Sequence, residues 1–75
     1  MSFQTRTTAD LVQIANAGGG FRLDARTRTT ADLVMIASAA SKHQAHITFA
    51  GMSVRTTADL VQIAAAGKGA IVLED

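Results

Sequence analysis

The stretch RTTADLVQIA fills residues 6–15, and the same ten letters return at residues 55–64. Between them, residues 28–37 read RTTADLVMIA, with Met35 as the only difference. One short unit written three times in a chain of 75 residues predicts a repeating structural element. A single copy cannot bury its apolar face alone, so the copies are expected to stack against one another.

Each copy carries the signature of a helix start. A threonine precedes an aspartate by three residues, which is the spacing of a capping box. These threonines are Thr7, Thr29 and Thr56. The apolar residues that follow recur at helical spacing and so lie on one face of a helix. Gly18 and Gly67 predict the ends of the first and third helices, whereas the middle copy lacks such a glycine and is expected to continue through Lys42.

A short segment of alternating apolar and polar residues follows each helix. The segments are FRLD at 21–24, HITF at 46–49 and IVLE at 71–74, and residues 2–4 suggest a further strand at the start. Such alternation predicts half-buried strands, and helices between strands require parallel pairing with right-handed crossovers. The sequence therefore predicts an α/β fold with a small four-stranded, mainly parallel sheet. One domain, 1–75, would contain three tandem helix–strand repeats, at about 6–24, 28–50 and 55–74.

The alternation also predicts that the helices cover one face of the sheet, because strands covered on both faces are continuously apolar. The residues expected under the helices are Phe3, Phe21, Leu23, Ile47, Phe49, Ile71 and Leu73. The residues expected on the open face are Gln4, Arg22, Asp24, His46, Thr48, Val72 and Glu74. In this arrangement Arg22, His46 and Val72 would form one row across the open face, and Asp24, Thr48 and Glu74 the next.

One strand and one helix in each unit of 20–29 residues resembles the leucine-rich repeat. The matching residues are Leu33, Val34, Ile36 and Ala37 followed by Ile47 and Phe49, with their equivalents in the other copies. The chain departs from that family because no Asn or Cys follows the strands. The resemblance implies a binding scaffold and not an enzyme.

Residues 31–74 also resemble the phosphocarrier protein HPr, through the order of helix, strand, Gly51 and the turn at 66–69. That family requires a histidine before its first helix, and this chain has Arg26, Thr27 and Arg28 in that place. The resemblance therefore implies no phosphotransfer.

The arginine that opens each copy is a candidate ligand-binding residue. In the predicted topology these arginines lie at the carboxyl ends of the strands, beside the free amides of helix starts, where anions bind. The candidates for a phosphate or carboxylate site are Arg6, Arg28, Arg55, Thr7, Thr29 and Thr56. The alternative is that each arginine pairs with the aspartate four residues later, as in Arg55 with Asp59, in a weak surface ion pair.

Several other motifs are better explained by structure than by chemistry. The glycines at 18–20 and 67–69 end helices, whereas a phosphate-binding loop opens one. His43 and His46 have no third metal ligand nearby in the sequence, so we expect no metal site and no cofactor. We also expect no catalytic site, because the carboxylates are mostly used as helix caps.

Composition narrows the remaining possibilities. The chain has no Cys, Trp or Tyr, and its formal net charge is +1. It thus lacks the basic stripe and stacking residues of nucleic-acid binding proteins. No apolar run is long enough to span a membrane, and no secretory signal begins the chain, so a cytoplasmic location is the expectation.

Self-association is the function that these features favour. A core this small usually needs reinforcement, and without cysteine or metal a partner chain is the remaining means. The exposed strand edge or the open sheet face would form the contact. The interface candidates are Arg22, His46, Ile71, Val72 and Leu73. The leading expectation is thus a non-enzymatic, homo-oligomeric interaction module that could also bind another protein, and the alternative is a small-anion binding protein.

Overall fold

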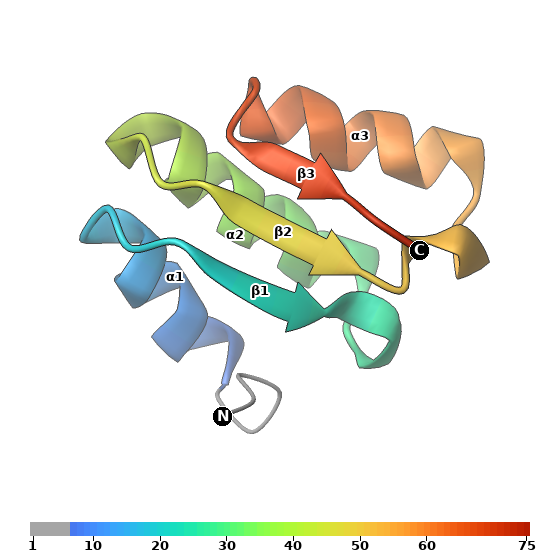
Figure 1. The fold of residues 1–75 in the computed structure, drawn as a ribbon, viewed down its shortest axis with the longest axis horizontal. Coiled ribbons are helices and arrows are strands. Elements are labelled where there is room, and N and C mark those ends of the chain that lie inside the picture. The colour runs from blue at the N-terminus through green and yellow to red at the C-terminus, as the bar shows by residue number, and fades with distance from the viewer. Residues whose placement is uncertain (1–6) are drawn as a thin grey trace.

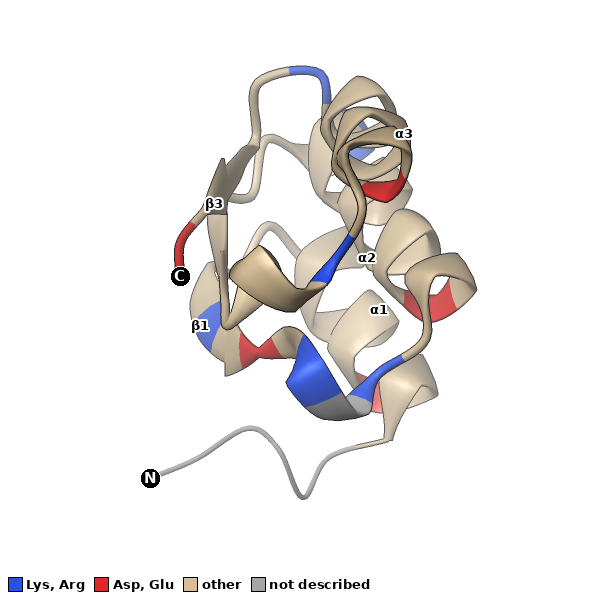
Figure 2. Cartoon of the chain, turned by 90° about the vertical axis from the view of Figure 1, so that its right-hand side faces the viewer, with Lys and Arg blue, Asp and Glu red and all other residues tan. Residues whose placement is uncertain are grey.

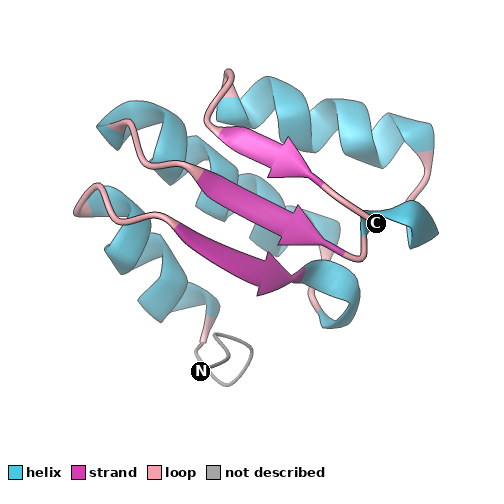
Figure 3. Cartoon of the chain, in the orientation of Figure 1, coloured by secondary structure: helices cyan, strands magenta, loops and turns pink. Residues whose placement is uncertain are grey.

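The computed structural model describes residues 7–75, in which helices and strands alternate (Figures 1 and 3). The elements are α1 (Thr8–Asn16), β1 (Phe21–Asp24), α2 (Thr30–His43), β2 (Ile47–Ala50), α3 (Thr57–Gly67) and β3 (Ile71–Leu73). Short 3₁₀ turns at Ala25–Thr27 and Met52–Val54 lead from β1 and β2 into the next helices. Each copy of the ten-residue stretch thus forms one helix.

The sheet is parallel, in the order β1-β2-β3. Viewed from its edge, the molecule has two layers, with the three helices on one face of the sheet (Figure 2). The predicted α/β class, the parallel pairing and the one-sided helix layer are confirmed. Within residues 7–75 the sheet has three strands and not the four that were predicted, and the expected strand at 2–4 lies outside the described residues.

The strand register differs from the predicted rows. Arg22 lies opposite Thr48, and Thr48 lies opposite Val72, so His46 is not a member of that row. The cause is that β2 begins at Ile47, one residue after the predicted start, and pairs with a stagger of two residues from the predicted alignment. A stagger of two keeps each side chain on its face because the side-chain period of a strand is two.

The predicted faces are accordingly confirmed for the residues of the three strands, whereas Phe3 and Gln4 lie outside the described residues and His46 precedes β2. Phe21, Leu23, Ile47 and Phe49 are buried under the helices, and Ile71 and Leu73 on β3 are half-buried. The helices complete the core from the other side. Their fully buried large residues are Leu11, Leu33, Ile36 and Ile63.

The three helices begin as the capping spacing predicts. The Oγ1 atoms of Thr7, Thr29 and Thr56 accept hydrogen bonds from the third amide of each helix, at 3.1, 3.2 and 3.2 Å respectively. These caps satisfy backbone donors that have no partner inside a helix. The same local sequence therefore fixes the same helix start three times.

The helix ends differ among the copies. α1 ends before Gly18, which has a left-handed φ of 84°, as predicted. α3 instead includes Gly67, and Lys68 takes the left-handed conformation with φ 50°. Gly67 serves close packing, because a Cβ atom on it would lie 2.3 Å from Cγ1 of Ile71. α2 continues to His43, past the predicted Lys42.

The contact between Gly67 and Ile71 gives a test of how α3 packs on β3. We expect Gly67→Ala to destabilise the fold by about 1–3 kcal/mol, because the added methyl group overpacks this junction. Chemical denaturation of the single and double variants measures the effect. In an Ile71→Ala background the same change should cost much less, and an equal cost in both backgrounds would contradict the packing argument.

Candidate interaction surface

Arginine side chains connect successive copies at the helix starts. Arg28 Nη1 donates a hydrogen bond to Thr8 Oγ1 at 3.0 Å, and Arg55 Nη1 donates to Thr30 Oγ1 at 2.7 Å. Thr8 and Thr30 are the second threonines of their copies. The arginine of each of these copies therefore binds the second threonine of the copy before it.

Arg55 makes the more extensive connection. Its Nη2 donates to the carbonyl oxygen of Ala25 at 2.8 Å and also to that of Arg28. Arg55 is half-buried, and within residues 7–75 it forms no ion pair with Asp59, so the predicted local pairing is wrong for this copy. Its guanidinium holds the segment between β1 and α2 against the start of α3.

These contacts use the groups that were predicted to bind an anion. The hydroxyls of Thr7, Thr29 and Thr56 cap their helices, and Arg28 and Arg55 bind acceptors of the chain itself. Arg6 lies outside the described residues. The arginines and threonines at the helix starts therefore chiefly connect one copy to the next.

The open face of the sheet carries charges that pair with one another. Arg22 Nη2 lies 2.9 Å from Glu74 Oε1, and Arg26 Nη2 lies 2.6 Å from Asp24 Oδ2. The hydrogen bonds of Arg26 to Asp24, followed by the charge of that carboxylate, raise the pKa of Arg26. Exposed pairs of this kind contribute little free energy. The face is therefore largely self-satisfied, with Val72 as its exposed apolar residue.

The remaining predicted site residues do not form a single cluster. His46 is exposed and precedes β2, while Ile71, Val72 and Leu73 form β3, which pairs with β2 and has no further strand beside it within residues 7–75. No group of three metal-ligating side chains occurs in this part of the chain.

A second surface emerges when equivalent helix positions are compared. The first leucine of the repeated stretch is fully buried as Leu11 and Leu33, but Leu60 is only half-buried. The alanine five residues after the aspartate behaves in the same way. Ala15 and Ala37 are fully buried, and Ala64 is exposed.

The valine of the repeated stretch follows the same rule. Val12 and Val34 pack partly buried against the core, whereas 62% of Val61 is exposed. These positions are covered in the two copies that another helix follows, and uncovered in α3. We call this group the end surface. It comprises Thr57, Leu60, Val61, Ala64 and Leu73.

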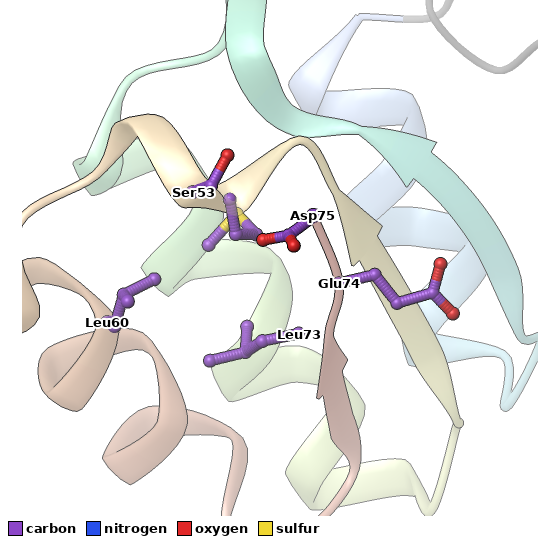
Figure 4. Close-up of a pocket in the computed structure, with 6 residues that line it drawn as sticks. Ser53, Leu60, Leu73, Glu74 and Asp75 are labelled. Carbon is purple, nitrogen blue, oxygen red and sulfur yellow. The ribbon is translucent and has the colours of Figure 1, made fainter.

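The end surface includes a hollow between α3 and the end of β3. Leu60 and Leu73 lie on either side of it, and Ser53, Glu74 and Asp75 line its rim (Figure 4). The strand residues equivalent to Leu73 are Leu23 and Phe49, which are essentially fully buried. The hollow therefore occupies the place where the next helix and strand would complete the core.

The opposite end of the molecule shows the reverse pattern. Ile36 and Ile63 are fully buried, whereas their equivalent Ile14 on α1 is only half-buried. Ile14 lies with Asp10, Gln13 and Ala17 beside an open hollow on α1. The isoleucine side of each helix therefore faces the preceding copy, and on α1 this side has no such neighbour within residues 7–75.

The chain matches no known protein family, no curated protein and no solved structure. Within residues 7–75, no helix has both the length and the apolar character needed to cross a membrane.

The sequence predicts a contact at the strand edge or on the open sheet face and does not single out the α3 side of the end surface. Leu60, Val61 and Ala64 belong to the repeated stretch, whose apolar residues the sequence places on one helical face without distinguishing the copies. The signal that identifies them is positional, because they are the same letters in the copy that no further helix follows within residues 7–75.

The arginine connection predicts a clear stability effect. Arg55→Ala should destabilise the chain by about 1–3 kcal/mol, because it leaves half-buried acceptors without their donor. Thermal or chemical unfolding measures the change. Arg26→Ala, which removes an exposed arginine at an adjacent turn, is the control and should have a much smaller effect. Equal effects of the two variants would argue against a connecting role for Arg55.

The same contacts predict weak or no anion binding at the helix starts. Titration with phosphate or sulfate should leave the amide resonances of Thr29 and Thr56 unchanged, because the neighbouring guanidinium groups already bind acceptors of the chain. Saturable shifts at both threonines that disappear in Arg55→Lys would instead support an anion site.

Proposed function

We propose that this chain is a non-enzymatic interaction module of three tandem helix–strand repeats, and that it associates with itself through the end surface. The observation that carries the proposal is the exposure of Leu60, Val61 and Ala64 on α3. The same residues are covered wherever another copy follows. The end surface therefore has the residues of a helix-packing surface, but no helix covers it within residues 7–75.

The free energy of burying apolar side chains also favours association through the end surface. Burying a Val or Leu side chain contributes about 1.5–3 kcal/mol relative to exposure. The end surface offers Val61, which is 62% exposed, and parts of Leu60 and Leu73. A small domain has little stability to spare, so covering these side chains would stabilise the fold and the assembly together.

The edge of β3 can contribute to the same contact. In a parallel strand, alternate residues direct their backbone groups to the same side. Ala70 O and Glu74 N bond to β2, so the backbone groups of Ile71 and Leu73 are directed to the outer edge. An exposed edge of this kind recruits another strand. The edge therefore lies beside the end surface, and one partner can engage both.

The resemblance to leucine-rich repeats supports a binding role over a catalytic one. The main alternative function is small-anion binding at the arginine and threonine helix starts. It is the weaker proposal because Arg28 and Arg55 already donate to Thr8 and Thr30. The open sheet face is the weaker contact for a similar reason, since its charges pair across it.

A charge placed in the end surface tests the proposal. Wild-type protein at micromolar concentration should have a mass well above 7.8 kDa by size-exclusion chromatography with light scattering. Val61→Lys should reduce it to the monomer mass, because an ammonium group cannot be buried in an apolar contact.

Met35→Lys is the matched control, because Met35 is 55% exposed on α2 and occupies a position that is Gln in the other copies. It should assemble like the wild type. A folded wild-type monomer at these concentrations, or equal loss of assembly in both lysine variants, would overturn the proposal.

A further inference from the structure

The first and third copies have identical letters over ten residues, so α1 and α3 offer the same side chains on each helix side. In α1, the helix side that carries Leu11 and Ala15 is fully buried, because the chain continues into α2, which packs beside α1. In α3, the same side is the end surface. Whatever fits that side of α1 therefore has the chemistry to fit α3.

The burial pattern indicates the group that covers this side at the internal contacts. It includes the isoleucine side of the next helix, fully buried as Ile36 and Ile63, and the arginine that precedes that helix. Arg28 and Arg55 reach the second threonine of the copy before them, at 3.0 and 2.7 Å. A partner for the end surface should offer the same two elements.

One isoleucine side of this chain is not covered by another copy within residues 7–75. It is the outer side of α1, where Ile14 is half-buried beside the hollow lined by Asp10, Gln13 and Ala17. The sequence also places an arginine, Arg6, immediately before the two threonines of this copy, as Arg28 and Arg55 stand in theirs.

We therefore propose that the partner is a second copy of this chain, bound head to tail, with the outer side of its α1 seated on the end surface. This inference rests on the self-association proposed above and specifies its geometry. The new contact repeats the α1–α2 and α2–α3 contacts, with Ile14 in the place of Ile36 and Ile63. Thr57, the equivalent of Thr8 and Thr30, is exposed and has no arginine donor within residues 7–75, so its hydroxyl is available to this contact.

A contact between two unlike surfaces does not saturate at a dimer. Each added copy presents a new end surface, so the assembly grows with concentration unless its rotation closes a ring. A contact of two end surfaces with each other would stop at two copies. The two geometries therefore differ in both stoichiometry and the surfaces they use.

Two lysine variants separate these geometries. Val61→Lys blocks the end surface, and Ile14→Lys blocks the outer side of α1. Head-to-tail binding predicts that each variant alone is a monomer by light scattering. It also predicts that an equimolar mixture forms a one-to-one dimer of twice 7.8 kDa, because the mixture retains one intact surface of each kind.

Ile14 is half-buried, so a second variant guards against misfolding. Ala17 is exposed and lines the same hollow, and Ala17→Lys should give the same monomer and the same mixed dimer. Circular dichroism confirms that each variant is folded. If both α1 variants still assemble like the wild type, or if the mixtures stay monomeric, the head-to-tail geometry is wrong. A monomeric wild type would instead overturn the proposed function itself.

Discussion

The packing of each helix on the one before it is the contact on which the rest of the structure depends. The burial pattern indicates that an isoleucine side packs against a leucine and alanine side, and an arginine connects the two helix starts. The guanidinium binds a side-chain hydroxyl and, in Arg55, backbone carbonyls as well. Such a donor serves several acceptors in one rigid geometry, so it fixes the spacing and the offset of neighbouring helices. Each strand directly follows its own helix in the chain, so helices that pack side by side also place their strands side by side in the parallel sheet.

Much of this fold could be predicted because its signals are local. The threonine caps, the alternation of the strands and the one-sided helix layer each depend on a few neighbouring residues. The register of β2 and the place of Gly67 inside α3 could not be predicted, because both depend on contacts between segments distant in sequence, such as Gly67 with Ile71. Arg55 was misassigned for the same reason. Its acceptors Thr30 and Ala25 are 25 and 30 residues away, whereas the sequence suggested Asp59 close by.

The candidate surface was only half predictable. The edge of β3 could be inferred from its apolar letters and its place at the end of the sheet. The α3 part could not, because a repeated sequence hides differences of environment. Val12 and Val61 are the same residue in the same local sequence, and only the presence or absence of a following helix decides that one is covered and the other is exposed.

The identity of the first and third copies supports a second copy of the chain as the proposed partner. The third copy here keeps Leu60, Val61 and Ala64, the same letters that α1 covers against α2. A surface with the sequence of an internal packing surface has a lower free energy against the isoleucine side of another such helix than in contact with water. A second copy would supply that side with the spacing already fixed by its own sequence, so the proposed partner requires no new recognition chemistry.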